Sequence, residues 1–367
     1  MLKPTGTHTI KTEASVPSGE TLTLRDCSVI FTNTLTLETG AKLIFENCVL
    51  DMSQLPTSAV ALDLYRSHLE LHHCEVKGRP KSADPFQKNT SVVRTTAHCD
   101  IRATHTYFDQ TWHFGTINQD RQTCFWFEHC HLIGGYDIFV GDCCVSFDHC
   151  RIENHRNSLV AFVVQLHMSN CHLSYTGNLL EATTLSLSYS HAGIAHVTAC
   201  QFENLRAIEY FAGWMSDCVF TDLGYIVCDR DNMYGELPLV SEFRDCQFHF
   251  TRPINKFTPW FSNPSLVSGC VFHAQTVPAI PVRFGLIQAN LESYETLIEQ
   301  STFQGFDTQN SYVILPGTFF HHNHGMATVR DCHFVDVTST HGQTIQTHAR
   351  SHDPVHHVDQ VHVIQTH

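Results

Sequence analysis

The sequence predicts an all-β chain that folds as a parallel β-helix, a solenoid of about 13 coils. A short motif centred on cysteine recurs along most of the chain, as in Phe45–Leu50, Phe147–Ile152 and Phe243–Phe248. The residues around each cysteine alternate between apolar and other types, which is the period of a strand. Apolar residues at helical spacing over ten or more positions are not found, so helical repeats are excluded.

The cysteines of this motif divide the chain into thirteen copies with an average step of about 25 residues, one β-helix coil each. Equivalent positions of successive coils stack about 4.8 Å apart, so one cysteine per coil is expected to form an inward ladder in the core. Serine replaces cysteine in one copy. The expected ladder residues are Cys27, Cys48, Cys74, Cys99, Cys130, Cys150, Cys171, Cys200, Cys218, Cys246, Cys270, Ser301 and Cys332.

The residue before each ladder position predicts a tight bend. Eleven of the thirteen are Asn, Asp, His or Gly, the types that best tolerate a left-handed backbone, and Ala199 and Gln300 are the others. Four consecutive copies carry histidine here, namely His73, His98, His129 and His149. The need for a residue that tolerates the bend explains these histidines without any bound metal. The alternative is that the row of histidines binds metal ions.

Composition excludes several classes of protein. The net charge of −14 provides no basic field for nucleic acid, so no nucleic-acid partner is expected. No apolar run is long enough to span a membrane, and no signal peptide is recognised at the start of the chain. With 16 Cys and no C-x-x-C pair, free thiols in a reducing compartment are expected. The protein is therefore expected to be cytoplasmic, or exported by a leaderless route.

The repeats run without a linker, so residues 1–340 are predicted to be one β-helix domain that includes an N-terminal cap over 1–25. Residues 341–367 hold seven histidines and are interpreted as a tail or cap, with a metal site as the alternative. No cofactor is expected. The four remaining cysteines are interpreted as core residues rather than nucleophiles; they are Cys124, Cys143, Cys144 and Cys228.

One segment resembles a known family. Residues 130–150 contain Gly-Gly-Tyr-Asp-Ile-Phe-Val-Gly between two motif cysteines, and this resembles the segment of pectin methylesterases that carries their nucleophilic aspartate. The resemblance implies the single-stranded right-handed parallel β-helix of the pectin lyase-like superfamily. It also implies that Asp137 is the nucleophile of a carbohydrate esterase, that Asp109 is its acid–base partner, and that Gln110 is an oxyanion donor.

A second hypothesis is a non-catalytic β-helix scaffold that binds a ligand or a partner. Leu187 stands where the family has an arginine that keeps the nucleophile ionised, and leucine cannot do this. A lyase would instead need a basic residue, for which Arg94, Arg230 and Arg252 are candidates. The first hypothesis is thus a β-helix protein that binds or modifies a polysaccharide. The expected partner is this polysaccharide, with a polyuronate as one option, and the oligomeric state is left open.

Overall fold

The computed structural model describes residues 5–56, 59–78, 92–109, 114–117, 122–134, 139–140, 143–155, 160–161, 165–177, 184–186, 194–228, 240–252, 260–275, 280–281, 285–289, 295–308, 313–316, 326–338, 358–359 and 362–364. Within these ranges the regular structure is β-strand, and none of them forms a helix. The described residues therefore contain no helix that could cross a lipid bilayer. The chain forms two compact units, Met1–Gly193 and Ile194–His367.

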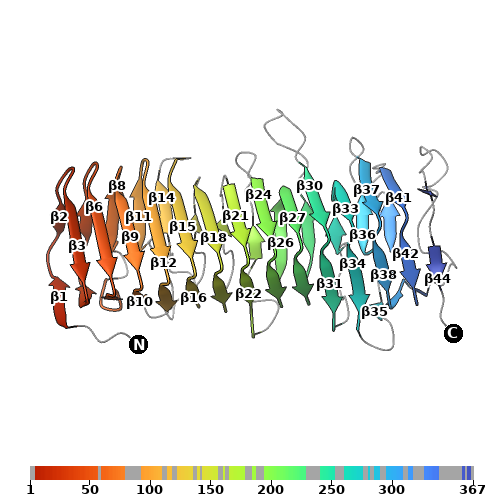
Figure 1. Cartoon of the computed structure of the whole chain (residues 1–367), viewed down its shortest axis with the longest axis horizontal. Helices are drawn as coiled ribbons and strands as arrows, with labels where there is room; N and C mark the ends of the chain where they lie inside the picture. Colours follow the sequence, from red (N-terminus) through yellow and green to blue (C-terminus); the bar gives the residue numbers. More distant parts are fainter. Residues whose placement is uncertain are drawn as a thin grey trace. The chain divides into compact units, whose positions relative to one another are not determined.

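Unit 1 is a right-handed parallel β-helix in which each coil contributes one strand to each of three sheets (Figure 1). Every strand pair in it with a printed register is parallel, as between β6 and β9. Sheet A contains β1 (Gly6–Ile10), β4 (Cys27–Phe31), β7 (Val49–Asp51), β10 (Glu75–Lys77), β13 (Tyr107–Asp109), β16 (His131–Ile133), β19 (Arg151–Glu153) and β22 (His172–Ser174). Sheet B contains β2 (Ala14–Val16), β5 (Leu35–Leu37), β8 (Leu62–Tyr65), β11 (Val93–Thr96), β14 (Phe114–Ile117), β17 (Phe139–Val140) and β20 (Val160–Ala161). Sheet C contains β3 (Thr21–Arg25), β6 (Lys42–Glu46), β9 (His68–His72), β12 (Asp100–Thr104), β15 (Cys124–Glu128), β18 (Cys144–Asp148) and β21 (Gln165–Ser169). The unit ends with β23 (Thr184–Ser186).

Unit 2 repeats this plan, and its strands are grouped here under the names A′, B′ and C′. Sheet A′ contains β25 (Gln201–Glu203), β28 (Val219–Thr221), β31 (Gln247–Phe250), β34 (Val271–Ala274), β38 (Thr302–Gln304), β42 (His333–Val335) and β44 (His362–Ile364). Sheet B′ contains β26 (Ala207–Phe211), β29 (Ile226–Cys228), β32 (Phe261–Ser262), β36 (Ile287–Ala289) and β40 (Ile314–Pro316). Sheet C′ contains β24 (Ile194–Thr198), β27 (Gly213–Ser216), β30 (Ser241–Arg244), β33 (Leu266–Ser268), β37 (Glu295–Glu299), β41 (Met326–Arg330) and β43 (Val358–Asp359). A further pair joins β35 (Ile280–Pro281) to β39 (Phe306–Asp307).

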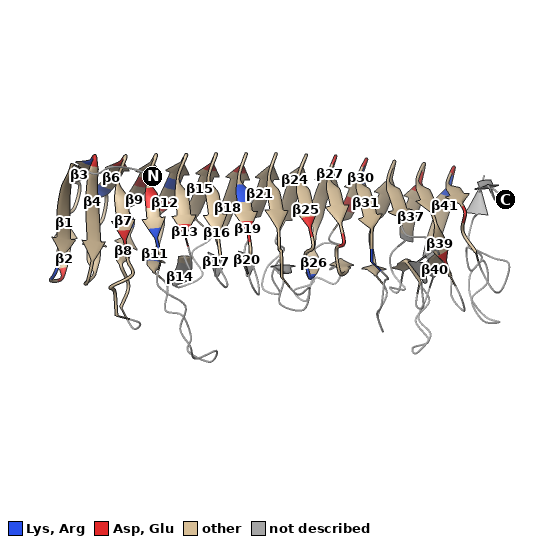
Figure 2. Cartoon of the chain, turned by 90° about the horizontal axis from the view of Figure 1, so that it is seen from below, with Lys and Arg blue, Asp and Glu red and all other residues tan. Residues whose placement is uncertain are grey.

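The alternating pattern decides which side chains enter the core. In β6, Leu43 and Phe45 are fully buried, while Lys42, Ile44 and Glu46 point outward. Charged residues of both signs are scattered over the outward positions, and facing positions of β8 and β11 carry opposite charges (Figure 2). A parallel β-helix is thus confirmed, with the inward residues of all three sheets sharing one core in each unit.

The inward ladder is confirmed with one correction. Strand registers show that the position between Cys74 and Cys130 is occupied by Thr106, and that Cys99 instead stacks between Ser67 and Thr123 at another corner. The predicted ladder was wrong at this copy because the motif was aligned on cysteine alone. The Thr106 hydroxyl donates to the carbonyl of Thr104, two residues back (3.0 Å).

Ladder cysteines make the same contact with their thiols. Sγ of Cys48 lies 3.3 Å from the carbonyl oxygen of Glu46, and the Ser301 hydroxyl donates to the carbonyl of Glu299 (2.9 Å). The position therefore requires a small side chain with a polar hydrogen. All 16 cysteines are free thiols, and burial raises the pKa of Cys74 to about 12, so the thiol stays protonated.

The predicted bends are confirmed. All thirteen residues that precede the expected ladder positions have positive φ, including Ala199 and Gln300. His98 belongs to the corner of Cys99, however, and the bend next to Thr106 is formed by His105, with φ of 50°. The row of bend histidines in unit 1 is therefore His73, His105, His129 and His149.

Unit 2 has a core built from stacked phenylalanines. Neighbouring rings along sheet A′ lie 4.6–5.0 Å apart between centroids and within 11° of parallel. The same inward position is phenylalanine in six successive coils. The distance between coils, about 4.8 Å, is also a suitable distance for stacked rings, so the rings stack along the sheet. The rings belong to Phe202, Phe220, Phe248, Phe272, Phe303 and Phe334.

Candidate functional site

The outward face of sheet C in unit 1 carries a hollow. It has a volume of about 500 Å³ and crosses four neighbouring strands, β9, β12, β15 and β18. Because the strands are parallel and in register, outward residues of successive coils line up in rows across the sheet. The lining residues are Glu70, His72, Arg102, Ala103, Thr104, Trp126, Phe127, Glu128, Ser146 and Asp148.

Trp126 is the aromatic centre of this hollow. Its neighbours Phe125 and Phe127 point into the core and are buried, so alternation places the indole on the outside. The side chain is 45% exposed, more than any other large hydrophobic residue among those described. An exposed indole surrounded by polar groups offers an apolar surface for stacking, beside groups that can form hydrogen bonds.

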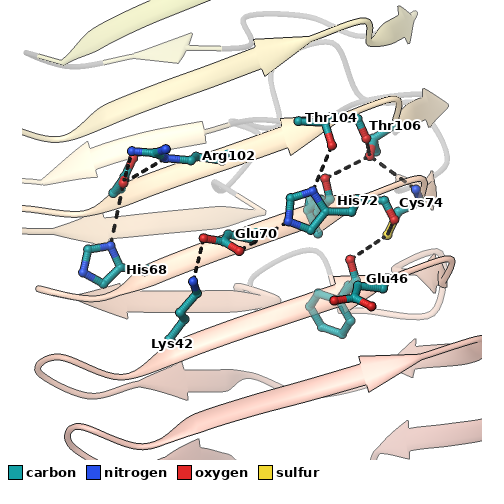
Figure 3. Close-up of polar contacts among 12 residues, drawn as sticks. Lys42, Glu46, His68, Glu70, His72, Cys74, Arg102, Thr104 and Thr106 are labelled. Carbon is teal, nitrogen blue, oxygen red and sulfur yellow. Dashed lines mark hydrogen bonds and ion pairs between the residues drawn. The ribbon is translucent and has the colours of Figure 1, made fainter.

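On one side of Trp126, polar side chains from three strands form a connected network (Figure 3). Glu70 accepts from Lys42 (Nζ–Oε1, 2.8 Å) and lies 3.3 Å from Nε2 of His72. The other ring nitrogen of His72 lies 2.9 Å from the Thr104 hydroxyl. Because a carboxylate only accepts, Nε2 donates to Glu70, and Nδ1 of a neutral ring then accepts from Thr104. Hydrogen bonds at both ring nitrogens thus fix the orientation of the imidazole.

Hydrogen bonds hold two carboxylates of this hollow ionised, those of Glu70 and Asp148. Burial alone raises the pKa of Glu70, but hydrogen bonds from Lys42 and His72 outweigh it and lower that pKa overall. The pKa of Asp148 is also lowered, first by the hydrogen bond from the hydroxyl of Ser169 (2.6 Å). Arg102 lies 3.0 Å from Asp100, which also approaches His68. Acidic groups therefore outnumber basic ones around the indole.

The stacked bend histidines are the chain neighbours of residues that line the hollow. They directly follow its outward residues His72, Thr104, Glu128 and Asp148 in sequence. Successive rings lie 4.8–4.9 Å apart between centroids, and Nδ1 of His149 lies 3.0 Å from Asp148. No group of three or more His, Cys, Asp or Glu that could hold a metal ion occurs within the described ranges, so the metal alternative gains no support there.

Of the predicted esterase residues, only Asp109 is among those that the structure describes. It lies at the end of β13 in sheet A, half-buried, between Lys77 and Ile133 of the adjacent strands. Asp137 and Gln110 lie outside the described residues, as does Leu187. Their assignment as an esterase site therefore stays a prediction, and Asp109 lies on a different sheet from the hollow.

Two of the predicted basic candidates are engaged in ion pairs. Nε of Arg94 donates to Asp63 (2.9 Å), a second bond joins the same two side chains, and these contacts raise the pKa of Arg94. An arginine bound in this way is a poor base. Arg252 contacts Asp222 at 3.4 Å, and Arg230 lies outside the described residues.

The hollow was not predicted from the sequence. Its signal was present in Cys124–Glu128, where a tryptophan occupies an outward position between two inward phenylalanines. Tryptophan at a solvent-facing strand position is unusual enough to be noticed. Identifying the surrounding residues requires strand register, because they come from coils separated by 20 to 32 positions in the sequence.

No protein-family model matches the chain, and no curated protein matches it either. Among solved structures, the Agl-KA catalytic domain is similar with a TM-score of 0.39 and 12% identity, over 95% of this chain and 63% of that one. The mannuronan C-5 epimerase AlgE4 A-module of Azotobacter vinelandii has a TM-score of 0.27 and 9% identity, over 99% and 90%. The PL6 family alginate lyase AlyGC has a TM-score of 0.25 and 10% identity, over 98% and 72%. At these identities and TM-scores, none of the similarities supports an assignment of activity.

Proposed function

We propose that the protein binds a polysaccharide along the outer face of sheet C, with Trp126 as the stacking platform. The half-exposed indole in a polar hollow is the observation that carries this proposal. The apolar face of a sugar ring can cover an indole, while its hydroxyl groups exchange hydrogen bonds with carboxylates and a guanidinium. A polymer that runs parallel to the axis of the β-helix crosses a new strand about every 4.8 Å, so it can contact outward residues of several strands.

Charge favours a neutral polysaccharide over a polyuronate. The hollow is lined by the carboxylates of Glu70, Glu128 and Asp148, against Arg102 in the lining and Lys42 beside it, which is bound to Glu70. The lowered pKa values of Glu70 and Asp148 keep these two carboxylates negative at neutral pH. A chain of uronates would bring further negative charge to this surface and be repelled.

The same pKa shifts favour binding over acid catalysis. A general acid needs a carboxyl group whose pKa is raised toward neutrality, as burial among apolar groups provides. Glu70 and Asp148 have lowered pKa values instead, because each accepts hydrogen bonds. The hollow is thus better suited to recognition than to glycoside cleavage.

Titration of the full chain with soluble neutral polysaccharides and with polygalacturonate tests the proposal. Trp126→Ala is expected to weaken binding at least tenfold, which corresponds to about 1.4 kcal/mol. Trp214→Ala is the matched control, since Trp214 is also partly exposed but lies in unit 2. Failure of every neutral glycan to bind, or equal binding by both variants, would contradict the site. Preference for polygalacturonate would contradict the charge argument.

A pectin methylesterase-like activity at Asp137 is a second proposal, supported by the sequence of residues 130–150. Methanol release from methylated pectin by wild type and by Asp137→Asn is the direct test. Activity in the wild type that is lost in the variant would support the esterase, and equal rates or no release would exclude it. Trp126→Ala is expected to leave this activity unchanged, because Asp109 lies on sheet A rather than sheet C.

A further inference from the structure

Two cysteines differ from all the others in their surroundings. Fourteen of the 16 thiols are buried, whereas Cys124 and Cys144 are partly exposed. Both were interpreted from sequence as core residues, and this is wrong for these two, because they occupy outward positions of sheet C. The other two off-ladder cysteines, Cys143 and Cys228, are buried as expected.

The two exposed thiols are direct neighbours. Cys124 begins β15 and Cys144 begins β18, and the parallel register pairs them with each other. Adjacent strands lie about 4.8 Å apart, which is within the Cα separation of disulfide-bonded cysteines. In the inward ladder, cysteines of neighbouring strands place their sulfurs 3.6 Å apart, as Cys27 and Cys48 show.

The geometry points to a reversible dithiol–disulfide site formed by Cys124 and Cys144 on the outer face of sheet C. The co-reactant is a low-molecular-weight disulfide such as oxidised glutathione. This inference is independent of the proposed glycan binding, although both concern the same sheet. Parallel strands hold the two β-carbons farther apart than most disulfides prefer, and the bond would be exposed, so it is expected to be easily reduced.

Each thiol lies near an oxygen that can accept its hydrogen, the carbonyl of Gln122 for Cys124 and Oε1 of Gln165 for Cys144, both at 3.8 Å. The contact between the two thiols lowers the pKa of Cys144 and, together with burial, raises the pKa of Cys124, so Cys144 is written here as the attacking thiol. The Cys144 thiolate attacks one sulfur of the small disulfide and releases the first thiol. Cys124 then loses its proton and attacks Sγ of Cys144, which releases the second thiol. The protein gives up two electrons and two protons, and the small disulfide takes them up.

The test uses the full chain without denaturant. In the reduced protein, maleimide is expected to label two cysteines, Cys124 and Cys144. After equilibration of the unlabelled protein with oxidised glutathione, maleimide is expected to label neither cysteine. The intact mass should be lower by two hydrogen atoms, and peptide mapping should find a Cys124–Cys144 link. Cys124→Ser is expected to keep one reactive thiol and to gain one glutathione at Cys144. The matched control Cys143→Ser changes the buried neighbour and is expected to oxidise like the wild type.

Several results would overturn the inference. One is a protein that keeps both reactive thiols at every glutathione ratio. Others are one glutathione on each cysteine without a link, or a disulfide that involves a buried ladder cysteine. The wild-type mapping decides among these without any variant, so poor folding of Cys124→Ser does not leave the inference untested.

Discussion

Replacing Phe248 with alanine tests how the core of unit 2 is held together. This side chain is fully buried and stacks between two rings, with centroids 4.7 Å from Phe220 and 4.6 Å from Phe272. It also meets Trp260 edge-on at 5.5 Å. Truncation of a buried phenylalanine costs about 3–5 kcal/mol, and each aromatic pair contributes about 0.5–1.5 kcal/mol beyond its buried area. Because the ring has stacked neighbours on both sides and further edge-on or tilted aromatic neighbours, a loss near the upper end, about 4–5 kcal/mol, is expected for Phe248→Ala.

Urea denaturation followed by tryptophan fluorescence measures this loss. Trp260 is buried against Phe248 and donates to the carbonyl of Leu223 (2.9 Å), so its emission reports on the mutated coil. In a solenoid each coil contacts its neighbours alone, so unfolding is expected to begin near the cavity. The transition midpoint should therefore shift strongly to lower urea.

Two variants complete this experiment. Phe248→Leu keeps most of the volume and loses the stacking, so about 1–2 kcal/mol is expected. Gln247→Ala changes the adjacent, outward-facing residue and is expected to stay within about 0.5 kcal/mol of wild type. If Phe248→Ala destabilises the protein no more than Gln247→Ala does, the phenylalanine stack is not the source of stability in this unit.

Three further predictions follow from backbone, ladder and charge. Gly213→Ala is expected to lower the thermal midpoint sharply, because a β-carbon there would lie 1.9 Å from the carbonyl oxygen of Ala195; an unchanged midpoint would show that the coil can open. Thr106→Cys is expected to leave the free energy of unfolding in urea nearly unchanged. Thr106→Val loses the hydroxyl and its hydrogen bonds, which is expected to lower that free energy by about 1–3 kcal/mol. Equal stability of the two variants would refute the requirement for a polar hydrogen. The lowered pKa of Glu70 stabilises the fold above the ordinary value of 4.5, and this contribution is lost as pH falls through the lower folded value. Unfolding of Glu70→Gln should therefore depend less on pH below about 4.5, and an identical acid profile would contradict the role of the Lys42 and His72 contacts.

Much of the fold could be predicted from sequence because its causes are local. A left-handed bend residue, a small ladder residue and alternating apolar positions recur in each coil, and each of these is visible in consecutive letters. The error at Thr106 has the same origin. Cysteine served as the marker of the ladder, while the physical requirement is a small side chain with a polar hydrogen, which threonine and serine also meet.

The candidate site could not be predicted in this way, because its parts are distant in sequence. Whether Glu70, Arg102, Trp126 and Asp148 share one surface depends on how many residues each loop inserts between coils, and strand pairing alone decides this. The thiols of Cys124 and Cys144 were likewise indistinguishable from core cysteines until their outward positions were known. The sequence by itself determined the coil, its bends and its core. The tertiary structure decided which outward side chains meet, since stacking converts distant positions into neighbours about 4.8 Å apart.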